Sequence, residues 1–210
     1  MDLAETAKQI EFEIDVPGFK TKELDIELQN DKLAVSGEQK ESPVSEDRSL
    51  TTFQLESTAF SNNGAIPTKF TGDGVDVSPP LSWRGIPQGT LELALICDDP
   101  DAPTPQPWVH WVLFGLPPET TRLPEGLPTT AELRTPVVAR QGRNSWPSGQ
   151  NHGYRGPAPP KGHGVHHYHF RLFALDAPLE LQPGIDKETL VAAMSGHRLG
   201  EAEWIGTFER

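Results

Sequence analysis

Residues 153–176, GYRGPAPPKGHGVHHYHFRLFALD, constrain the possible folds more than any other part of this chain. Their first half contains so many glycines and prolines that it can form neither a helix nor a central strand. From Val165 onward the pattern becomes that of a β-strand rich in histidine. A similar segment, CDDPDAPTPQPWVHWVLFGL, begins at Cys97. Each segment joins a stiff proline loop to a strand with histidine, and two such pairs that converge would make a small polar pocket suited to an anion.

Glycine and proline are frequent along the whole chain, with 19 and 21 residues of 210. Short apolar runs lie between these breakers, and this pattern predicts a mostly β architecture. Helix signals gather in one segment, where Asp186 is the expected N-cap of a helix over 187–199 that ends at Gly200. We expect the main strands at 91–97, 108–114, 165–175 and 204–208.

A period of two assigns the side chains of these strands to two faces. On the strand at 108–114, one face is expected to hold Trp108, His110, Val112 and Phe114. On the strand at 165–175, one face is expected to hold His166, Tyr168, Phe170 and Leu172, with His167 and His169 on the other. The single cysteine, Cys97, lies inside an apolar run, cannot form an internal disulfide and is expected to be buried.

The formal net charge of −12 limits the classes of partner. Sustained contact with nucleic acid or with anionic membranes requires clustered Lys and Arg, so this charge argues against both. The sequence has no run of the roughly 20 apolar residues that a spanning helix needs, and its first residues lack the features of a signal peptide. We therefore expect a cytoplasmic protein, without membrane insertion, that binds any anion at a local site.

The composition also divides the chain. Residues 1–40 alternate apolar and acidic positions, the polar stretch 41–50 is expected to be a linker, and residues 51–210 form the main domain. The alternation in the first part predicts three strands, at 10–16, 24–28 and 33–36. So few strands bury little apolar surface, so we expect an acidic appendage to the main domain.

Three runs in this appendage, FEIDVPGF, ELDIELQN and KLAVSGEQK, resemble part of the small heat-shock protein (alpha-crystallin) domain. The resemblance covers residues 9–40. The later strands of that domain, through which the family forms dimers and oligomers, have no counterpart here. Chaperone function is therefore not implied.

The main domain carries two longer signatures. DDPDAP at 98–103 is followed by WVHW at 108–111, and YRGPAPPKGHGVHHYHF stands at 154–170. The end of the chain adds AAMSGHRL and GTFER. In this order, the segments resemble the signatures of the phosphatidylethanolamine-binding protein family, in its bacterial and archaeal Raf-kinase-inhibitor-like branch. The resemblance covers residues 51–210, a complete domain of that family.

This resemblance implies two antiparallel β-sheets packed face to face, one or two peripheral helices, and a shallow anion pocket. The implied pocket residues are Asp99, Pro103, His110, Gly156, Ala158, Pro159, His166 and Tyr168. The implied function is non-catalytic binding of a phosphate-type head group or another small anion, with no cofactor and no catalytic residue. The imidazoles of His110 and His166 would donate to the anion in their protonated forms. Asp99 would orient one of these rings, and Tyr168 would add a hydroxyl donor.

Two details of the loops carry further expectations. Ala158 stands where the family commonly has glycine or cysteine, and its methyl group narrows the approach to the anion loop. A cis X-Pro bond within DDPDAP would suit a tight turn. Outside the pocket, Asp98 and Asp101 are expected to cap turns, His163 is expected at the rim, and Trp108 is expected in the core.

Three alternatives stay open. His110, His166 and Asp99 form a His₂-carboxylate set that resembles zinc ligands, although the preferred interpretation has no metal. Ser145 or Ser148 with a histidine base would make a hydrolase, but Gly-x-Ser-x-Gly is absent. The third alternative is a protein-interaction module that inhibits a kinase or protease through the pocket rim. The sequence also leaves a homodimer open.

Overall fold

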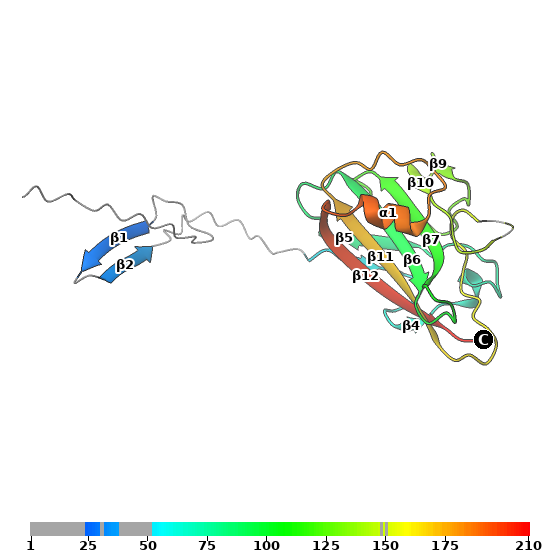
Figure 1. Ribbon diagram of the computed structural model, residues 1–210. Coiled ribbons are helices and arrows are strands. Elements are labelled where there is room, and N and C mark those ends of the chain that lie inside the picture. Colours follow the sequence, from blue (N-terminus) through cyan, green and yellow to red (C-terminus); the bar gives the residue numbers. More distant parts are fainter. Residues whose placement is uncertain (1–23, 30–31, 38–51, 148, 150) are drawn as a thin grey trace, which may run out of the picture. The chain divides into compact units, whose positions relative to one another are not determined.

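The computed structural model describes residues 24–29, 32–37, 52–147, 149 and 151–210 (Figure 1). The chain divides into two compact units, Met1–Asp47 and Arg48–Arg210. In the first unit, β1 (Leu24–Gln29) pairs with the antiparallel β2 (Lys32–Gly37). These two strands agree with the predictions at 24–28 and 33–36. The strand predicted at 10–16 and the linker predicted at 41–50 lie outside the described residues.

The described part of the second unit is mostly β, as predicted. Its larger sheet has the strand order β4-β12-β11-β6-β7-β10-β9, and its smaller sheet has the order β3-β5-β8. The pairings are antiparallel except that of β4 with β12. The strands of the larger sheet are β4 (Gly64–Ala65), β6 (Glu92–Asp99), β7 (Trp108–Leu116), β9 (Glu132–Leu133), β10 (Ala139–Gln141), β11 (His166–Leu175) and β12 (Arg198–Phe208). Those of the smaller sheet are β3 (Gln54–Glu56), β5 (Leu81–Arg84) and β8 (Arg122–Leu123).

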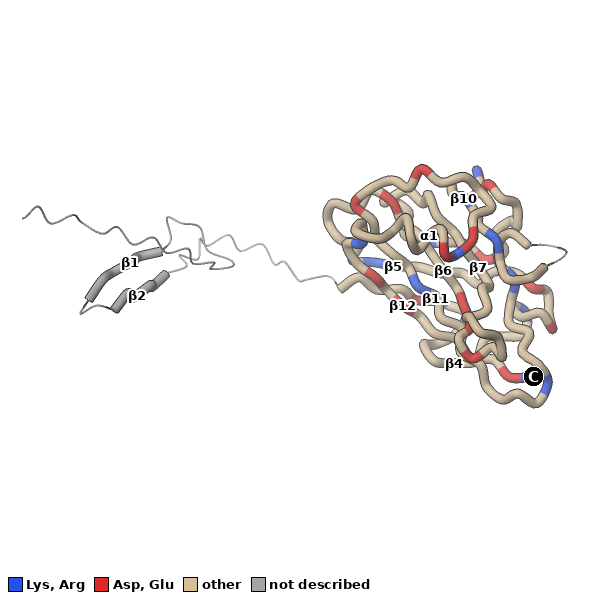
Figure 2. Tube along the Cα trace, viewed as in Figure 1, with Lys and Arg blue, Asp and Glu red and all other residues tan. Residues whose placement is uncertain are grey.

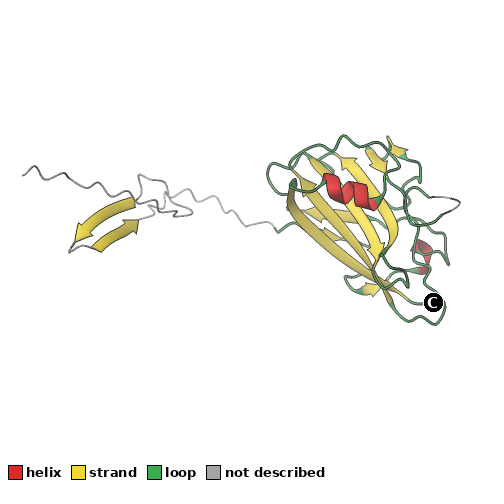
Figure 3. Cartoon of the chain, viewed as in Figure 1, coloured by secondary structure: helices red, strands yellow, loops and turns green. Residues whose placement is uncertain are grey.

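Two cores hold these layers together. One cluster joins the smaller sheet to the larger one and includes Leu55 and Trp83 with Phe170. The other lies on the opposite face, where Leu190 and Met194 pack on the larger sheet. Figures 1 and 3 show the helix α1 (Lys187–Ala193) across that face. The prediction of two β-sheets packed face to face, with a peripheral helix, is therefore confirmed.

The helix is shorter than predicted. Asp186 is its N-cap, and its carboxylate accepts a hydrogen bond from the Thr189 backbone N–H at 2.9 Å. The helix ends at Ala193, however, because the chain turns at Gly196, whose φ of +81° lies in the left-handed region that favours glycine. The residues after this turn join β12, which pairs with β11 along almost its whole length. Gly200 therefore lies inside a strand.

A β-bulge between β6 and β7 includes His110. Cys97 is paired with Trp111, whereas the next residue, Asp98, is paired with Val109, so His110 is the additional residue on β7. An extra residue interrupts the alternation of side chains and redirects the bulged one. The alternation of side chains that the sequence predicts for this strand therefore breaks at His110.

The bulge separates His110 from two residues that the sequence predicts on the same face of the strand. Val112 and Phe114 pack in the core beneath the helix, and Val109 joins them. His110 instead contacts the ring of Tyr168, with 5.0 Å between ring centroids, and Tyr168 belongs to the other core. The prediction that His110 shares a face with Val112 and Phe114 is wrong, because the bulge turns His110 toward β11.

Asp98, expected to cap a turn, is instead a buried member of an ion network. Its carboxylate accepts hydrogen bonds from Arg171 Nη2 at 2.9 and 2.7 Å and also contacts Lys187 Nζ. The Asp98 side chain is 3% exposed, whereas those of Lys187 and Arg171 are 15% and 30% exposed.

Elsewhere in the second unit, acidic and basic residues are interspersed (Figure 2). Cys97 is buried as predicted, and burial raises the pKa of its thiol.

Candidate functional site

The two proline loops meet beside the ends of β6, β7 and β11, where they enclose a pocket of about 230 Å³. The structure brings together seven of the eight residues named from the sequence. These are Asp99, Pro103, His110, Ala158, Pro159, His166 and Tyr168. The eighth, Gly156, shapes the loop without lining the pocket.

Gly156 allows two loops to approach closely. A Cβ at this position would lie 2.2 Å from the carbonyl oxygen of Phe70, so no larger residue fits there without movement. The Gly156 backbone N–H donates to Asp76 Oδ1 at 2.6 Å, and the nearby Tyr154 hydroxyl donates to the Phe70 carbonyl at 2.7 Å. These contacts fix the loop that carries Ala158 and Pro159.

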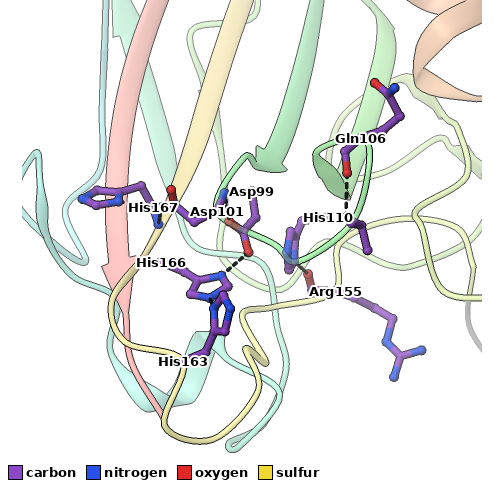
Figure 4. A network of polar contacts seen from close by, with 9 residues as sticks. Asp99, Asp101, Gln106, His110, Arg155, His163, His166 and His167 are labelled. Carbon is purple, nitrogen blue, oxygen red and sulfur yellow. Dashed lines mark hydrogen bonds and ion pairs between the residues drawn. The ribbon is translucent and has the colours of Figure 1, made fainter.

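His166 lies in the middle of a chain of polar contacts (Figure 4). Its Nδ1 is 2.7 Å from Asp99 Oδ2, and because an ionised carboxylate only accepts, this nitrogen donates. Its Nε2 is 2.7 Å from Nδ1 of His163. Asp99 is itself held in place, since its Oδ1 accepts from the Asp101 backbone N–H at 2.9 Å. Asp99 therefore orients the buried imidazole of His166.

His163 takes part in the site more directly than the sequence indicated. Its ring lies 5.0 Å from that of His166 between centroids, and its Nδ1 covers Nε2 of His166 at 2.7 Å. Gly162 and Gly164, on either side, have φ angles of +75° and +91°, which favour glycine. The loop can turn twice within three residues and bring His163 back onto His166. The Gly-His-Gly run was the signal in the sequence that could have indicated this role.

The ring of His110 is held by the opposite loop. Its Nδ1 lies 2.6 Å from the backbone carbonyl oxygen of Arg155, and a carbonyl only accepts, so Nδ1 carries the hydrogen. Burial lowers the pKa of His110 to about 4. This low pKa opposes the expected protonation of His110, because removal of water disfavours its charged form.

Tyr168 completes the predicted set. The residue is 1% exposed, and its hydroxyl has no hydrogen-bond partner in the part of the chain that the structure describes. Burial raises the pKa of Tyr168 well above its ordinary value, so the hydroxyl remains a donor. Buried hydroxyls in folded proteins nearly always have a partner. This hydroxyl beside the pocket therefore points to a ligand or water that accepts its hydrogen bond.

One wall of the pocket is aromatic and was not predicted. Trp146 lies edge-on to both Trp108 and His110, at centroid distances of 5.4 and 5.1 Å. The guanidinium of Arg155 stacks over Trp146 at 4.6 Å. Trp108, expected in the core, lines the pocket together with Trp146. The pairing could not be read from the sequence, because Trp108 begins β7 whereas Trp146 lies in a loop 38 positions further along the chain.

The remaining pocket expectations have mixed outcomes. His167 lies on the opposite face from His166, as predicted; it is exposed, and its Nδ1 is 2.7 Å from Asp101 Oδ2. Asp101 also accepts from the His167 backbone N–H at 2.8 Å, so it braces the loop against β11. The cis X-Pro bond found in the described residues precedes Pro136, not a proline of DDPDAP.

Two observations on the described residues concern the zinc-site and hydrolase alternatives. They contain no group of three His, Cys, Asp or Glu side chains placed to hold a metal ion. The Ser145 hydroxyl oxygen accepts a hydrogen bond from the Val109 backbone N–H at 2.8 Å, and Ser148 lies outside the described residues.

No helix in the described part is long and apolar enough to cross a membrane.

Comparison with known families agrees with this arrangement. The model of the family described as phosphatidylethanolamine-binding protein matches residues 56–209. The chain belongs to the phosphatidylethanolamine-binding protein family. A model of the Hsp20/alpha crystallin family matches residues 2–78, a longer stretch than the resemblance at 9–40 indicated.

Relatives of this family member extend across both bacteria and archaea. A UPF0098 protein of Methanothermobacter thermautotrophicus is 51% identical over 156 residues, which cover 74% of this chain and 98% of the relative. A phosphatidylethanolamine-binding protein homolog of Chlamydia trachomatis has a similar structure, with a TM-score of 0.67 and 37% identity over 76% of this chain and 98% of that one. Escherichia coli YbcL, described as a new member of the mammalian family, gives a TM-score of 0.69 and 30% identity over 75% and 98%.

Proposed function

We propose that this protein is a non-catalytic binding protein whose pocket takes a phosphate-type head group or a similar small anion. The observation that carries the proposal is the buried hydroxyl of Tyr168, which lines the pocket and has no partner among the described residues. An anionic oxygen accepts strong hydrogen bonds from such a donor. His166, oriented by Asp99, supplies a second donor when it is protonated.

The size and walls of the pocket favour a head group over a whole lipid. Its volume of about 230 Å³ lies below the roughly 300–1,000 Å³ typical of sites for drug-sized ligands. Loops held by Pro103, Pro159 and Pro160 form part of the wall, and prolines limit the ordering that binding would require. Trp108 and Trp146 offer an apolar surface to the rest of a small ligand.

The absence of catalysis is part of this proposal. Inhibition of a kinase or protease through the pocket rim, a homodimer and a cytoplasmic location stay predictions. The hydrolase alternative finds no support in Ser145, whose hydroxyl oxygen serves as an acceptor for the backbone of β7.

Replacing His166 with Gln tests the site. We expect affinity for inorganic phosphate to fall roughly 10- to 100-fold, because a charge-assisted hydrogen bond contributes roughly 1.5–3 kcal/mol. Isothermal titration calorimetry on the full chain measures the loss. The matched control is His167→Gln, one residue away on the opposite, exposed face, for which we expect less than a twofold change.

Two results would contradict the proposal. If wild-type protein does not bind phosphate or O-phosphorylethanolamine, the pocket is not an anion site. If the His166 and His167 variants lose affinity equally, the anion does not bind at His166. Stoichiometric zinc binding without phosphate binding would favour the metal-site alternative.

Replacing His163 with Ala is expected to have the opposite sign. The His163 ring covers Nε2 of His166, so an anion that binds this nitrogen must first displace it. Loss of that competing hydrogen bond should tighten phosphate binding about fivefold, corresponding to about 1 kcal/mol, the usual net contribution of one hydrogen bond. The same titration measures it, with His197→Ala at an exposed histidine as control. Weaker binding by the His163 variant would show instead that His163 is a ligand-binding donor.

A further inference from the structure

We infer that His110 makes the pocket select anions that still carry an acidic hydrogen, such as a phosphate monoester, over fully deprotonated anions of the same shape, such as a sulfate ester. This inference rests on the proposed function and deepens it, because it names the ligand chemistry required at one ring nitrogen. It also assigns to His110 a role opposite to that of a charged donor.

The first step is the orientation of the ring. His110 and Arg155 are joined twice: Nδ1 of the ring lies 2.6 Å from the Arg155 carbonyl oxygen, and the Arg155 backbone N–H donates to the His110 carbonyl at 3.0 Å. A carbonyl has no hydrogen to give, so Nδ1 carries one in every protonation state. The nitrogen left for a ligand is Nε2.

The second step is the charge of the ring. His110 is 2% exposed and lies between two aromatic rings, edge-on to Trp146 at 5.1 Å and to Tyr168 at 5.0 Å. This loss of water lowers the pKa of His110 to about 4. The hydrogen bond to the Arg155 carbonyl acts in the opposite direction, as do the carboxylates of Asp99, Asp98 and Asp76. Near neutral pH, Nε2 therefore has a lone pair and accepts hydrogen bonds.

The third step is what such an acceptor requires of a ligand. Tyr168 donates a hydrogen bond, and His166 donates one when it is protonated, so both serve the oxygens of phosphate and sulfate equally well. Nε2 of His110 needs a hydrogen-bond donor, and the only donor that the anionic group itself can offer is an O–H. A phosphate monoester has its second pKa near about 6 and readily holds one hydrogen, whereas a sulfate ester holds none. A buried acceptor that faces an anionic oxygen without a hydrogen should weaken binding roughly 10- to 100-fold.

A matched pair of ligands tests this inference. O-phosphorylethanolamine and ethanolamine O-sulfate have the same ethanolamine part and similar anionic groups. At pH 5, below the second pKa of the phosphate ester of about 6, both carry the same net charge, so total charge does not favour either. By calorimetry on the full chain, we expect the phosphate ester to bind about tenfold more tightly, because His110, one pH unit above its pKa of about 4, can take a proton for the sulfate ester at a cost of about tenfold.

The variant His110→Gln removes the selection while it keeps a polar group. An amide both donates and accepts, so it can serve either ligand, and we expect the ratio of the two affinities to fall to within about threefold. His197→Gln, at an exposed histidine outside the pocket, should keep the wild-type ratio. Near-ultraviolet circular dichroism confirms that each variant is folded.

Nitrogen-15 NMR of histidine-labelled wild-type protein gives a second measurement that needs no variant. We expect Nε2 of His110 to be unprotonated at pH 5 and to shift as an acceptor when the phosphate ester is added. Equal affinities for the two esters, or a protonated Nε2 in the complex, would overturn the inference and leave the proposed function intact. If neither ester binds, the proposed function fails, and this inference fails with it.

Discussion

Replacing Tyr168 with Phe is expected to stabilise the fold and to weaken phosphate binding at the same time. The hydroxyl is buried without a partner among the described residues, and an unsatisfied buried donor costs roughly 1–3 kcal/mol. Its removal leaves the ring, which packs against His110 at 5.0 Å, in place. Thermal unfolding should therefore shift upward, by about 2–4 °C for each kcal/mol in a chain of this size.

The loss of affinity has the same cause. If the anion accepts a hydrogen bond from this hydroxyl, Tyr168→Phe should weaken phosphate binding about tenfold or more. Tyr154→Phe is the control, because that hydroxyl donates to the Phe70 carbonyl at 2.7 Å; its removal should lower stability. A Tyr168 variant with unchanged phosphate affinity would show that the hydroxyl does not contact the anion. A lower melting temperature would show that it already has a partner in the free protein.

Replacing Asp98 with Ala is expected to cause a large loss of stability, about 3 kcal/mol. The carboxylate is buried and accepts hydrogen bonds from Arg171 Nη2 at 2.9 and 2.7 Å, next to Lys187 Nζ. Its removal leaves two cations without their shared partner, one of them largely buried. We expect the melting temperature to fall by roughly 6–12 °C, as measured by calorimetry or circular dichroism.

The control is an exposed pair on the same domain. Asp176 contacts His197, and both side chains are about half exposed, so Asp176→Ala should cost less than about 1 kcal/mol. The double variant Asp98→Ala with Lys187→Met should recover part of the lost stability, because it removes one of the unpaired cations. Equal losses for Asp98→Ala and Asp176→Ala would contradict the view that Asp98 neutralises a buried cluster.

Local patterns in the sequence were sufficient for the main elements. The alternation over 165–175 predicted β11 within one residue, and it separated His166 from His167 correctly because β11 continues without a bulge from His166 to Phe173. Asp186 was predicted as an N-cap because capping depends on a residue three positions away. The helix end was missed, because either Gly196 or Gly200 could end a helix in the sequence, and only the pairing of β12 with β11 excludes the second.

The family resemblance carried by the two proline signatures also implied, without the structure, which residues would surround the pocket. A strand end and the loop next to it stay close together in any fold that contains them. Each of the pairs Asp99 with Pro103 and Ala158 with Pro159 therefore stays together, and the structure places both pairs in the same cavity as His166. Whether these residues bind an anion stays a prediction, to be decided by the titrations described above.

Only the tertiary structure decided the chemical state of the site. The bulge at His110 depends on how β6 and β7 are paired. The carbonyl that fixes its ring belongs to a residue 45 positions away, and the cation beside Asp98 lies 89 positions away. Segments distant in the chain supply the partner of each polar group, and the packing of these segments determines how far the group is shielded from water. The sequence by itself therefore determined the main strands and, through the family resemblance, the residues around the pocket, whereas the fold decided that His110 accepts, that His163 covers His166, and that Asp98 is paired.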